Sequence, residues 1–221
     1  MEVLVVGASR GIGLEFVRQY RAEGDAVVGT ARSAPGEERV RALGATPVAL
    51  DVADAASALA LAGRLGARRF DLVIVNAGVS GPRSAPLEVP TLDEFDAVMR
   101  TNVLGPMRVI AQVRQALAPG AKLVVLSSRM GSMGDRSSAG SGVYRASKAA
   151  VNSVLKDAAL TLAGHAVCVA QHPGWVRTDM GGAGADLGVE ESVRSMCRIF
   201  AALGPADNGR FLDIDGRTLP W

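Results

Sequence analysis

A tyrosine and a lysine four residues apart have the types and spacing for acid–base chemistry in this 221-residue chain. Tyr144 and Lys148 open an Ala-rich run that continues to about Leu162. On a helix, residues i and i+4 share one face, so the ammonium group would lie beside the phenol. A nearby positive charge favours the phenolate, and we expect Lys148 to lower the Tyr144 pKa from its usual value of about 10. The pair alone is a weak signal, because Tyr-x-x-x-Lys also arises by chance on helix surfaces.

A glycine-rich loop near the start of the chain has the arrangement that binds a pyrophosphate. Val3–Val6 predicts a buried strand, and it leads into Gly7–Ala8–Ser9–Arg10–Gly11–Ile12–Gly13 and then a helical pattern. Glycines permit a tight turn, a close approach of the backbone to phosphate and close helix–strand packing. The N-terminus of the following helix attracts the same anion. The order strand, glycine loop, helix therefore predicts a dinucleotide site.

The end of the second predicted strand bears on which dinucleotide is bound. An NAD-selective site places Asp or Glu there to hold the ribose 2′-hydroxyl. This chain has Thr30–Ala31–Arg32 after the run Ala26–Thr30, and Arg10 lies inside the glycine loop. Two guanidinium groups would suit a 2′-phosphate. We therefore expect NADP(H), with NAD(H) as the alternative in which both arginines are solvated surface residues.

The rest of the chain alternates strand and helix patterns. Further strands are expected at Thr46–Leu50, Asp71–Val75, Lys122–Leu126, Ala166–Ala170 and Arg210–Ile214, and further helices at Glu37–Leu43, Ala53–Leu65, Thr91–Leu117 and Val189–Leu203. Thr91 and Glu94 form a capping box, and Pro106 predicts an interruption of its helix. The glycine-rich residues 179–188 are expected to form a mobile flap. The pattern predicts an α/β Rossmann fold, a doubly wound parallel sheet of about seven strands in one domain, 1–221.

Composition excludes several classes of protein. Hydrophobic residues make up 48% and the net charge is only +2, so neither a nucleic acid nor a membrane is expected as partner. Cys168 and Cys197 lie in apolar segments and are expected to be buried free thiols, and no metal site is expected. With no leader pattern and no apolar run of membrane-spanning length, we expect a soluble cytoplasmic protein.

Taken together, six features in order along the chain resemble the short-chain dehydrogenase/reductase family. They are Gly7-x-x-x-Gly11-x-Gly13, Asn76–Ala77–Gly78, Asn102, Ser128, Tyr144-x-x-x-Lys148 and Pro173–Gly174. The stretches Ser127–Ser132, His172–Val176 and Asp215–Trp221 look most like the C-factor-like and small carbonyl-reductase members. The resemblance covers nearly the whole chain.

The resemblance implies a role for each matching residue. Tyr144 would be the acid for carbonyl reduction and the base for alcohol oxidation, and Lys148 would lower its pKa and hold the nicotinamide ribose. Ser128 would bind the substrate oxygen, and Asn102 would fix a water that links Lys148 to solvent. Asp51 and Val52 would flank the adenine, and Asn76, Ala77 and Gly78 would lie beside the adenosine ribose. Pro173, Gly174, Val176 and Thr178 would bracket the nicotinamide, with Thr178 on its carboxamide. His172 is expected to be a structural or rim residue.

Two departures from the family pattern affect these roles. The family usually has Thr before its first glycine, and Val6 stands there, so one hydrogen bond of the loop is in doubt. The spacing from Ser128 to Tyr144 is longer than the commonest one, which makes Ser132 a second candidate for the serine role.

The resulting hypothesis is an NADPH-dependent oxidoreductase that reduces an aldehyde or ketone, reversibly, with Tyr144 as proton donor. One alternative is a C-factor-like signalling or sensor protein that binds NADP(H) with little turnover. Another is an NAD-linked alcohol dehydrogenase. The substrate is a small molecule that the loops 79–86, 129–142 and 179–188 would line. The resemblance implies a homodimer or homotetramer that forms through the helices at about 91–117 and 144–163, with a monomer, as among small carbonyl reductases, as the alternative.

Overall fold

Seven short aliphatic segments form one parallel sheet in the computed structural model, which describes all residues 1–221. The strands are β1 (Glu2–Val6), β2 (Ala26–Ala31), β3 (Thr46–Ala49), β4 (Phe70–Val75), β5 (Leu117–Leu126), β6 (Ala166–Gln171) and β7 (Arg210–Leu212). Their order in the sheet is β3-β2-β1-β4-β5-β6-β7. The chain therefore winds outward in both directions from β1, and the direction reverses between β1 and β4. In such sheets, ligands bind beyond the carboxyl ends of the strands at this reversal.

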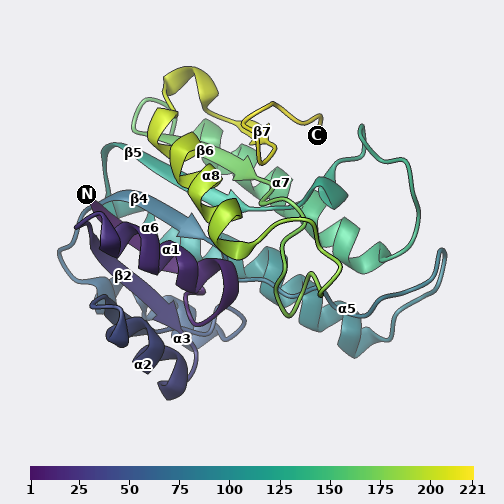
Figure 1. Cartoon of the computed structure of the whole chain (residues 1–221), viewed down its shortest axis with the longest axis horizontal. Helices are drawn as coiled ribbons and strands as arrows, with labels where there is room; N and C mark the ends of the chain where they lie inside the picture. Colours follow the sequence, from purple (N-terminus) through teal and green to yellow (C-terminus); the bar gives the residue numbers. More distant parts are fainter.

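Helices cover both faces of the sheet, as the alternating pattern predicts (Figure 1). They are α1 (Gly11–Ala22), α2 (Ala34–Ala42), α3 (Ala55–Leu59), α4 (Leu61–Leu65), α5 (Leu92–Met99), α6 (Gly105–Val113), α7 (Gly142–Thr161) and α8 (Val189–Ala202), with the short helical turns η1 (Arg100–Leu104), η2 (Arg114–Ala116), η3 (Arg129–Gly131) and η4 (Pro205–Asp207). Residues of α1, α2 and α8 pack into one core cluster, and residues of α4, α6 and α7 into the other.

The predicted helix over Thr91–Leu117 is divided by a wider turn. The capping box is present, since Thr91 accepts from the Glu94 backbone N–H and the Glu94 carboxylate accepts from the Thr91 N–H. The interruption comes just before Pro106, where η1 is a π-helical turn. Gly105 N–H donates to the Arg100 carbonyl, five residues back instead of four. Pro106 then stands in the first turn of α6, where its missing N–H is harmless.

Three predicted boundaries are wrong for local reasons. Ala53–Leu65 is two helices, because Ala60 has ψ −8° and opens the hydrogen-bond ladder between α3 and α4. Strand β5 begins at Leu117, which pairs with Phe70 across a register shift. Strand β7 ends at Leu212, because the Asp213 N–H donates to the Arg217 carbonyl and turns the chain.

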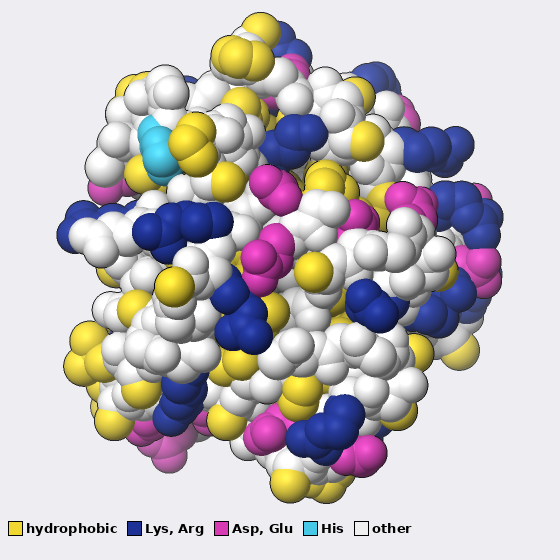
Figure 2. All heavy atoms as spheres, turned by 90° about the vertical axis from the view of Figure 1, so that its left-hand side faces the viewer, with side chains coloured by type: hydrophobic (Ala, Val, Ile, Leu, Met, Phe, Trp, Pro, Cys, Tyr) yellow, Lys and Arg dark blue, Asp and Glu magenta, His cyan; other side chains and the backbone are white.

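The surface on the side of the N-terminus has no large patch of one charge or of hydrophobic side chains. Figure 2 shows basic and acidic side chains interspersed there, with hydrophobic side chains scattered among them. Cys168 is a buried free thiol and Cys197 a half-buried one, as expected. None of the helices combines the length and the apolar character that crossing a membrane requires. The two large cavities lie elsewhere, at the carboxyl ends of the strands.

Candidate active site

Two cavities meet beyond the carboxyl ends of the strands. The first, of about 490 Å³, lies along the glycine loop, and we call it the glycine-loop cavity. The second, of about 590 Å³, lies beside Ser128, and we call it the Ser128 cavity. Six residues line both of them: Ile12, Ser127, Tyr144, Pro173, Thr178 and Met180. Tyr144 is therefore placed where a ligand in one cavity would face a ligand in the other.

Most of the residues predicted to bind a cofactor line the glycine-loop cavity. These are Gly7, Ser9, Arg10, Gly11, Ile12, Arg32, Asp51, Val52, Asn76, Ala77, Gly78, Tyr144, Lys148, Pro173 and Thr178. Gly174 and Val176 line the Ser128 cavity instead, together with Ser128 itself. Gly13 and Asn102 line neither cavity; they lie beneath the surface and support it.

The backbone of the glycine loop requires glycine at two positions for different reasons. Gly7 has φ +86°, a left-handed conformation that other residues rarely adopt. At Gly13, a Cβ atom would lie 2.0 Å from the Gly7 carbonyl oxygen, which also accepts a 2.6 Å hydrogen bond from Asn76 Nδ2. The hydrogen bond in doubt at Val6 is supplied from another strand, because Thr30 Oγ1 accepts from the Gly7 N–H at 3.0 Å. The loop is thus tied to both neighbouring strands.

Gly13→Ala is expected to lower the free energy of unfolding by about 1–3 kcal/mol, because the added methyl group forces the Gly7 carbonyl away from Asn76. Urea unfolding followed by circular dichroism measures the change. Gly63→Ala is a matched control, since nothing lies within 4 Å of its added Cβ and α4 would gain a better helix former. Equal stability of Gly13→Ala and wild type would contradict this packing.

Two arginines, Arg10 and Arg32, line the glycine-loop cavity. Arg10 Nη1 forms a 2.7 Å ion pair with Asp179 of the segment after β6, and both side chains are largely exposed. Arg32 lines the same cavity and has no acidic partner within 4.0 Å. Arg39 of α2 donates to the Ser9 carbonyl at 2.7 Å and so holds the loop from a third side. The part of the cavity at Arg10 and Arg32 is suited to a dianion.

The electrostatics of Tyr144 differ from the expectation drawn from its spacing with Lys148. Burial raises the pKa of Tyr144 above its ordinary value, and hydrogen bonding to the Ser128 side chain opposes this only in part. Lys148 Nζ lies 5.8 Å from the Tyr144 ring centroid and donates at 2.9 Å to the Leu126 carbonyl, not to the phenol. The predicted lowering of the Tyr144 pKa is therefore wrong for this structure, because burial dominates.

Lys148 is itself among the buried charged groups. Its side chain is covered on the floor of the glycine-loop cavity, and desolvation lowers its pKa from 10.5 to about 8. At neutral pH the amine remains mostly protonated. The helix α7 thus holds an ammonium group and a neutral phenol on one face, both facing the junction of the two cavities.

Asn102 occupies the π-helical turn and joins three elements. Its amide donates to the Val79 carbonyl at 2.8 Å and to Ser147 Oγ at 3.0 Å, and its Oδ1 accepts from the Val79 N–H at 2.8 Å. The side chain is fully buried. Asn102 therefore positions the strand-end segment after β4 against α7, the helix that carries Tyr144 and Lys148.

The geometry separates the two candidate serines. Ser128 lines the cavity; its Oγ accepts from the Met130 N–H at 3.2 Å, which leaves its hydrogen for Tyr144. Ser132 is buried, donates to the Pro220 carbonyl and accepts from the Asp135 N–H at 3.0 Å. Ser132 is thereby engaged in anchoring the loop, and Ser128 is the serine that faces the cavity.

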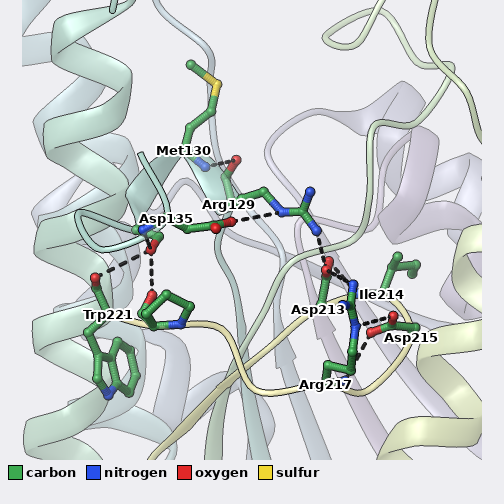
Figure 3. Close-up of polar contacts among 11 residues, drawn as sticks. Arg129, Met130, Asp135, Asp213, Ile214, Asp215, Arg217 and Trp221 are labelled. Carbon is green, nitrogen blue, oxygen red and sulfur yellow. Dashed lines mark hydrogen bonds and ion pairs between the residues drawn. The ribbon is translucent and has the colours of Figure 1, made fainter. Parts of the chain in front are cut away.

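An ion-pair network fixes the residue after Ser128. Figure 3 shows Arg129 reaching between Asp135 and Asp213, with Arg217 on the other side of Asp213. The Asp213 side chain is only 2% exposed, and its second oxygen accepts from the Ile214 N–H. His172 lines the Ser128 cavity, and burial lowers its pKa to about 4, so it is neutral at pH 7.

Several contacting residues carry no signal in the sequence. Thr30, Arg39 and Asp179 reach the glycine loop from separate segments, and Ser147 holds Asn102 from α7. Each is an ordinary polar residue in its own segment. Its partner becomes evident only when the strands are assembled.

Comparisons with known proteins show which family the sequence is similar to. The sequence model of the short chain dehydrogenase family matches residues 2–186. The C-signal protein of Myxococcus xanthus is 40% identical over 154 residues, which cover 68% of this chain and 92% of that protein. The 1-hydroxy-2-glutathionyl-2-methyl-3-butene dehydrogenase of Rhodococcus sp. (strain AD45) is 35% identical over 229 residues, with 99% of each chain covered.

A solved structure is similar over the whole chain. The carbonyl reductase of Pseudomonas aeruginosa PAO1, in complex with NADP, superposes with a TM-score of 0.87 at 33% identity, covering 100% of this chain and 99% of that one.

Proposed function

Because this chain belongs to the short chain dehydrogenase family, we propose that it is an oxidoreductase that reduces an aldehyde or ketone to an alcohol with NADPH. The observation that carries the proposal is the position of Tyr144, at the junction of two cavities with Ser128 on one side and Lys148 on the other. Such a junction lets a proton donor face the place where two ligands meet.

The glycine-loop cavity fits NADPH by the chemistry of its residues. Gly7 and Gly13 let the loop turn tightly at the N-terminus of α1, where its backbone would face a pyrophosphate, and a Cβ at Gly13 would push the Gly7 carbonyl out of place. Arg10 and Arg32 would hold the 2′-phosphate, with Asp51 and Val52 beside the adenine. Asn76, Ala77 and Gly78 would flank its ribose. Lys148 would hold the nicotinamide ribose, and Pro173 and Thr178 the nicotinamide. The solved carbonyl reductase with NADP supports this choice of cofactor.

NADPH, when bound, supplies the hydride. The Tyr144 hydroxyl would donate the proton to the substrate oxygen, which Ser128 Oγ holds by donating a hydrogen bond. The Lys148 ammonium would stabilise the phenolate that remains at Tyr144. Burial keeps Tyr144 protonated at neutral pH, which is the form that reduction requires. Asn102 is proposed as a positioning residue, since its side chain contacts Val79 and Ser147.

The experiment that tests the proposal combines binding and turnover. NADPH and NADH are titrated by fluorescence at one ionic strength, and aldehydes, ketones and quinones are then screened for loss of NADPH absorbance. Binding without turnover of any carbonyl would favour a sensor or signalling protein, the class that the name C-signal suggests. Preference for NADH with alcohol oxidation would favour an NAD-linked dehydrogenase; the Rhodococcus relative is named as a dehydrogenase.

A homodimer through α5, α6 and α7 is also proposed. The α5–α6 segment exposes the large apolar side chains of Phe95, Leu104 and Met107 at 42%, 38% and 47%. Exposed apolar surface of this kind favours association. We expect light scattering to give twice the chain mass, and Phe95→Glu with Met107→Glu to give a monomer. A wild-type monomer at micromolar concentration would contradict the proposal.

A further inference from the structure

The Ser128 cavity carries a group of cations that the reaction chemistry does not use. Its charged lining residues are Arg83, Arg129, Asp135, Arg136 and Arg145. Arg129 and Asp135 pair with each other, and Arg129 also pairs with Asp213, as Figure 3 shows. The other three arginines have no carboxylate within 4.0 Å. The cavity wall therefore has an uncompensated positive charge.

Hydrogen bonds to the loop gather these arginines. Arg145 Nε donates to the Gly140 carbonyl at 3.0 Å and its Nη2 to Ser138 Oγ at 2.9 Å, while Arg136 Nε donates to the Ser138 carbonyl at 3.1 Å. The two guanidinium groups thus share Ser138, and burial, with a smaller contribution from the Arg136 charge, lowers the pKa of Arg145. Two cations held this close, each with N–H donors unused, form a fork that matches a carboxylate.

The start of α7 adds to the positive electrostatic potential of the Ser128 cavity. This 20-residue helix begins at Gly142 with no side-chain cap and no acidic residue in its first turn. Its positive end is therefore uncompensated, and Ser141, Tyr144 and Arg145 of that turn line the cavity. The loop carrying Arg83 joins the same wall, because the Ser141 N–H donates to the Ser84 carbonyl at 3.0 Å. Figure 1 shows both loops projecting beyond the same side of the sheet.

We propose that the Ser128 cavity selects carbonyl substrates that carry a carboxylate remote from the reacting group, bound by Arg136 and Arg145. The inference rests on the proposed reductase function, since it names the substrate class of that site. The carbonyl lies at Tyr144 and Ser128, and the carboxylate lies at the paired guanidinium groups near the start of α7. Neutral carbonyls of the same shape lack this second attachment and bind less tightly.

The test compares 4-formylbenzoate with its methyl ester, which has nearly the same shape and no charge. With NADPH saturating, we expect kcat/KM for 4-formylbenzoate to exceed that for the ester by about tenfold at low ionic strength, and salt to reduce this ratio. Arg136→Gln with Arg145→Gln should lower the ratio to about one. Arg136→Lys, which keeps the charge, should retain most of it. A wild-type ratio of one or below, or a double variant with the wild-type ratio, overturns the inference.

A control separates this site from the charge of the whole molecule. Arg114→Gln removes one exposed arginine at the turn before the amino end of β5, far from both cavities, and should leave the ratio at its wild-type value. An equal fall of the ratio in this control would mean that net charge, not the site, sets the preference.

A direct binding measurement distinguishes failure of the reductase function from failure of the anion site. If neither these aldehydes nor any carbonyl of the screen is reduced although NADPH binds, the proposed function fails. The anion site is then decided by calorimetric titration of 4-formylbenzoate into the NADP-bound protein. Binding that weakens about tenfold or more in the double variant supports the site, and binding that is absent in the wild type or equal in both proteins overturns it.

Discussion

Tyr144→Phe is expected to lower kcat for carbonyl reduction by roughly 10²- to 10⁴-fold, the range that general acid catalysis contributes. The change removes one oxygen atom, and with it the only donor of α7 that faces both cavities. The ring and its packing remain, so NADPH should bind with an affinity within about threefold of wild type. Turnover is measured by NADPH absorbance, and binding by fluorescence titration.

The chain offers a matched control for this substitution, because it contains only one other tyrosine. Tyr20 is buried in the core between α1 and α8, where its hydroxyl interacts with Cys197. Tyr20→Phe makes the same chemical change far from both cavities and should retain wild-type turnover. If Tyr144→Phe also retained it, the proton would have to come from another group, and the proposed role of Tyr144 would be wrong.

The double change Arg10→Ala with Arg32→Ala is expected to weaken NADPH binding by about 10- to 100-fold. Charge-assisted hydrogen bonds contribute about 1.5–3 kcal/mol each, and part of this is recovered by solvent at an exposed site. NADH has no 2′-phosphate, so its affinity should change by less than about threefold. The ratio of the two dissociation constants, measured by fluorescence titration, is therefore the quantity to follow.

The ion pair of Arg10 with Asp179 provides a change in the opposite direction. Asp179→Asn removes the carboxylate that occupies Arg10 and is expected to tighten NADPH binding by a few-fold. Arg41 lies on the exposed side of α2 and pairs with Glu38. Arg41→Ala therefore removes a positive charge away from the site, and it is the control that shows how far a change of total charge alone affects NADPH binding. If the double arginine variant weakened NADPH and NADH equally, the 2′-phosphate interpretation would be wrong and the arginines would act on the pyrophosphate or the fold.

Patterns that are local in the sequence predicted the fold well. The aliphatic runs gave six of the strands close to their observed positions, because strands buried on both faces need continuous apolar residues. The part of β5 before Lys122 was missed, since Pro119 and Gly120 interrupt its pattern. The split at Ala60 has no local breaker at all. Both depend on how the segment packs against its neighbours.

The candidate site was predictable where the chemistry depends on one segment. The glycine loop and the Tyr144–Lys148 pair lie within single elements, and the structure brings both to the same junction. The Tyr144 pKa was not predictable, since burial comes from the whole fold. The same holds for the Arg10–Asp179 pair, whose members are 169 residues apart.

The π-helical turn Arg100–Leu104 limits how many residues can lie between α5 and α6. Each residue of an α-helix advances the chain by about 100° around its axis, so one residue added to a turn changes the rotational phase of everything beyond it. The wider turn therefore offsets the rotational phase of α6 from that of α5. Deleting any one residue of Arg100–Leu104 would let the ladder close as an α-helix, and either Asn102 or α6 would turn away from its partners. These five residues carry a constraint on number as well as on type.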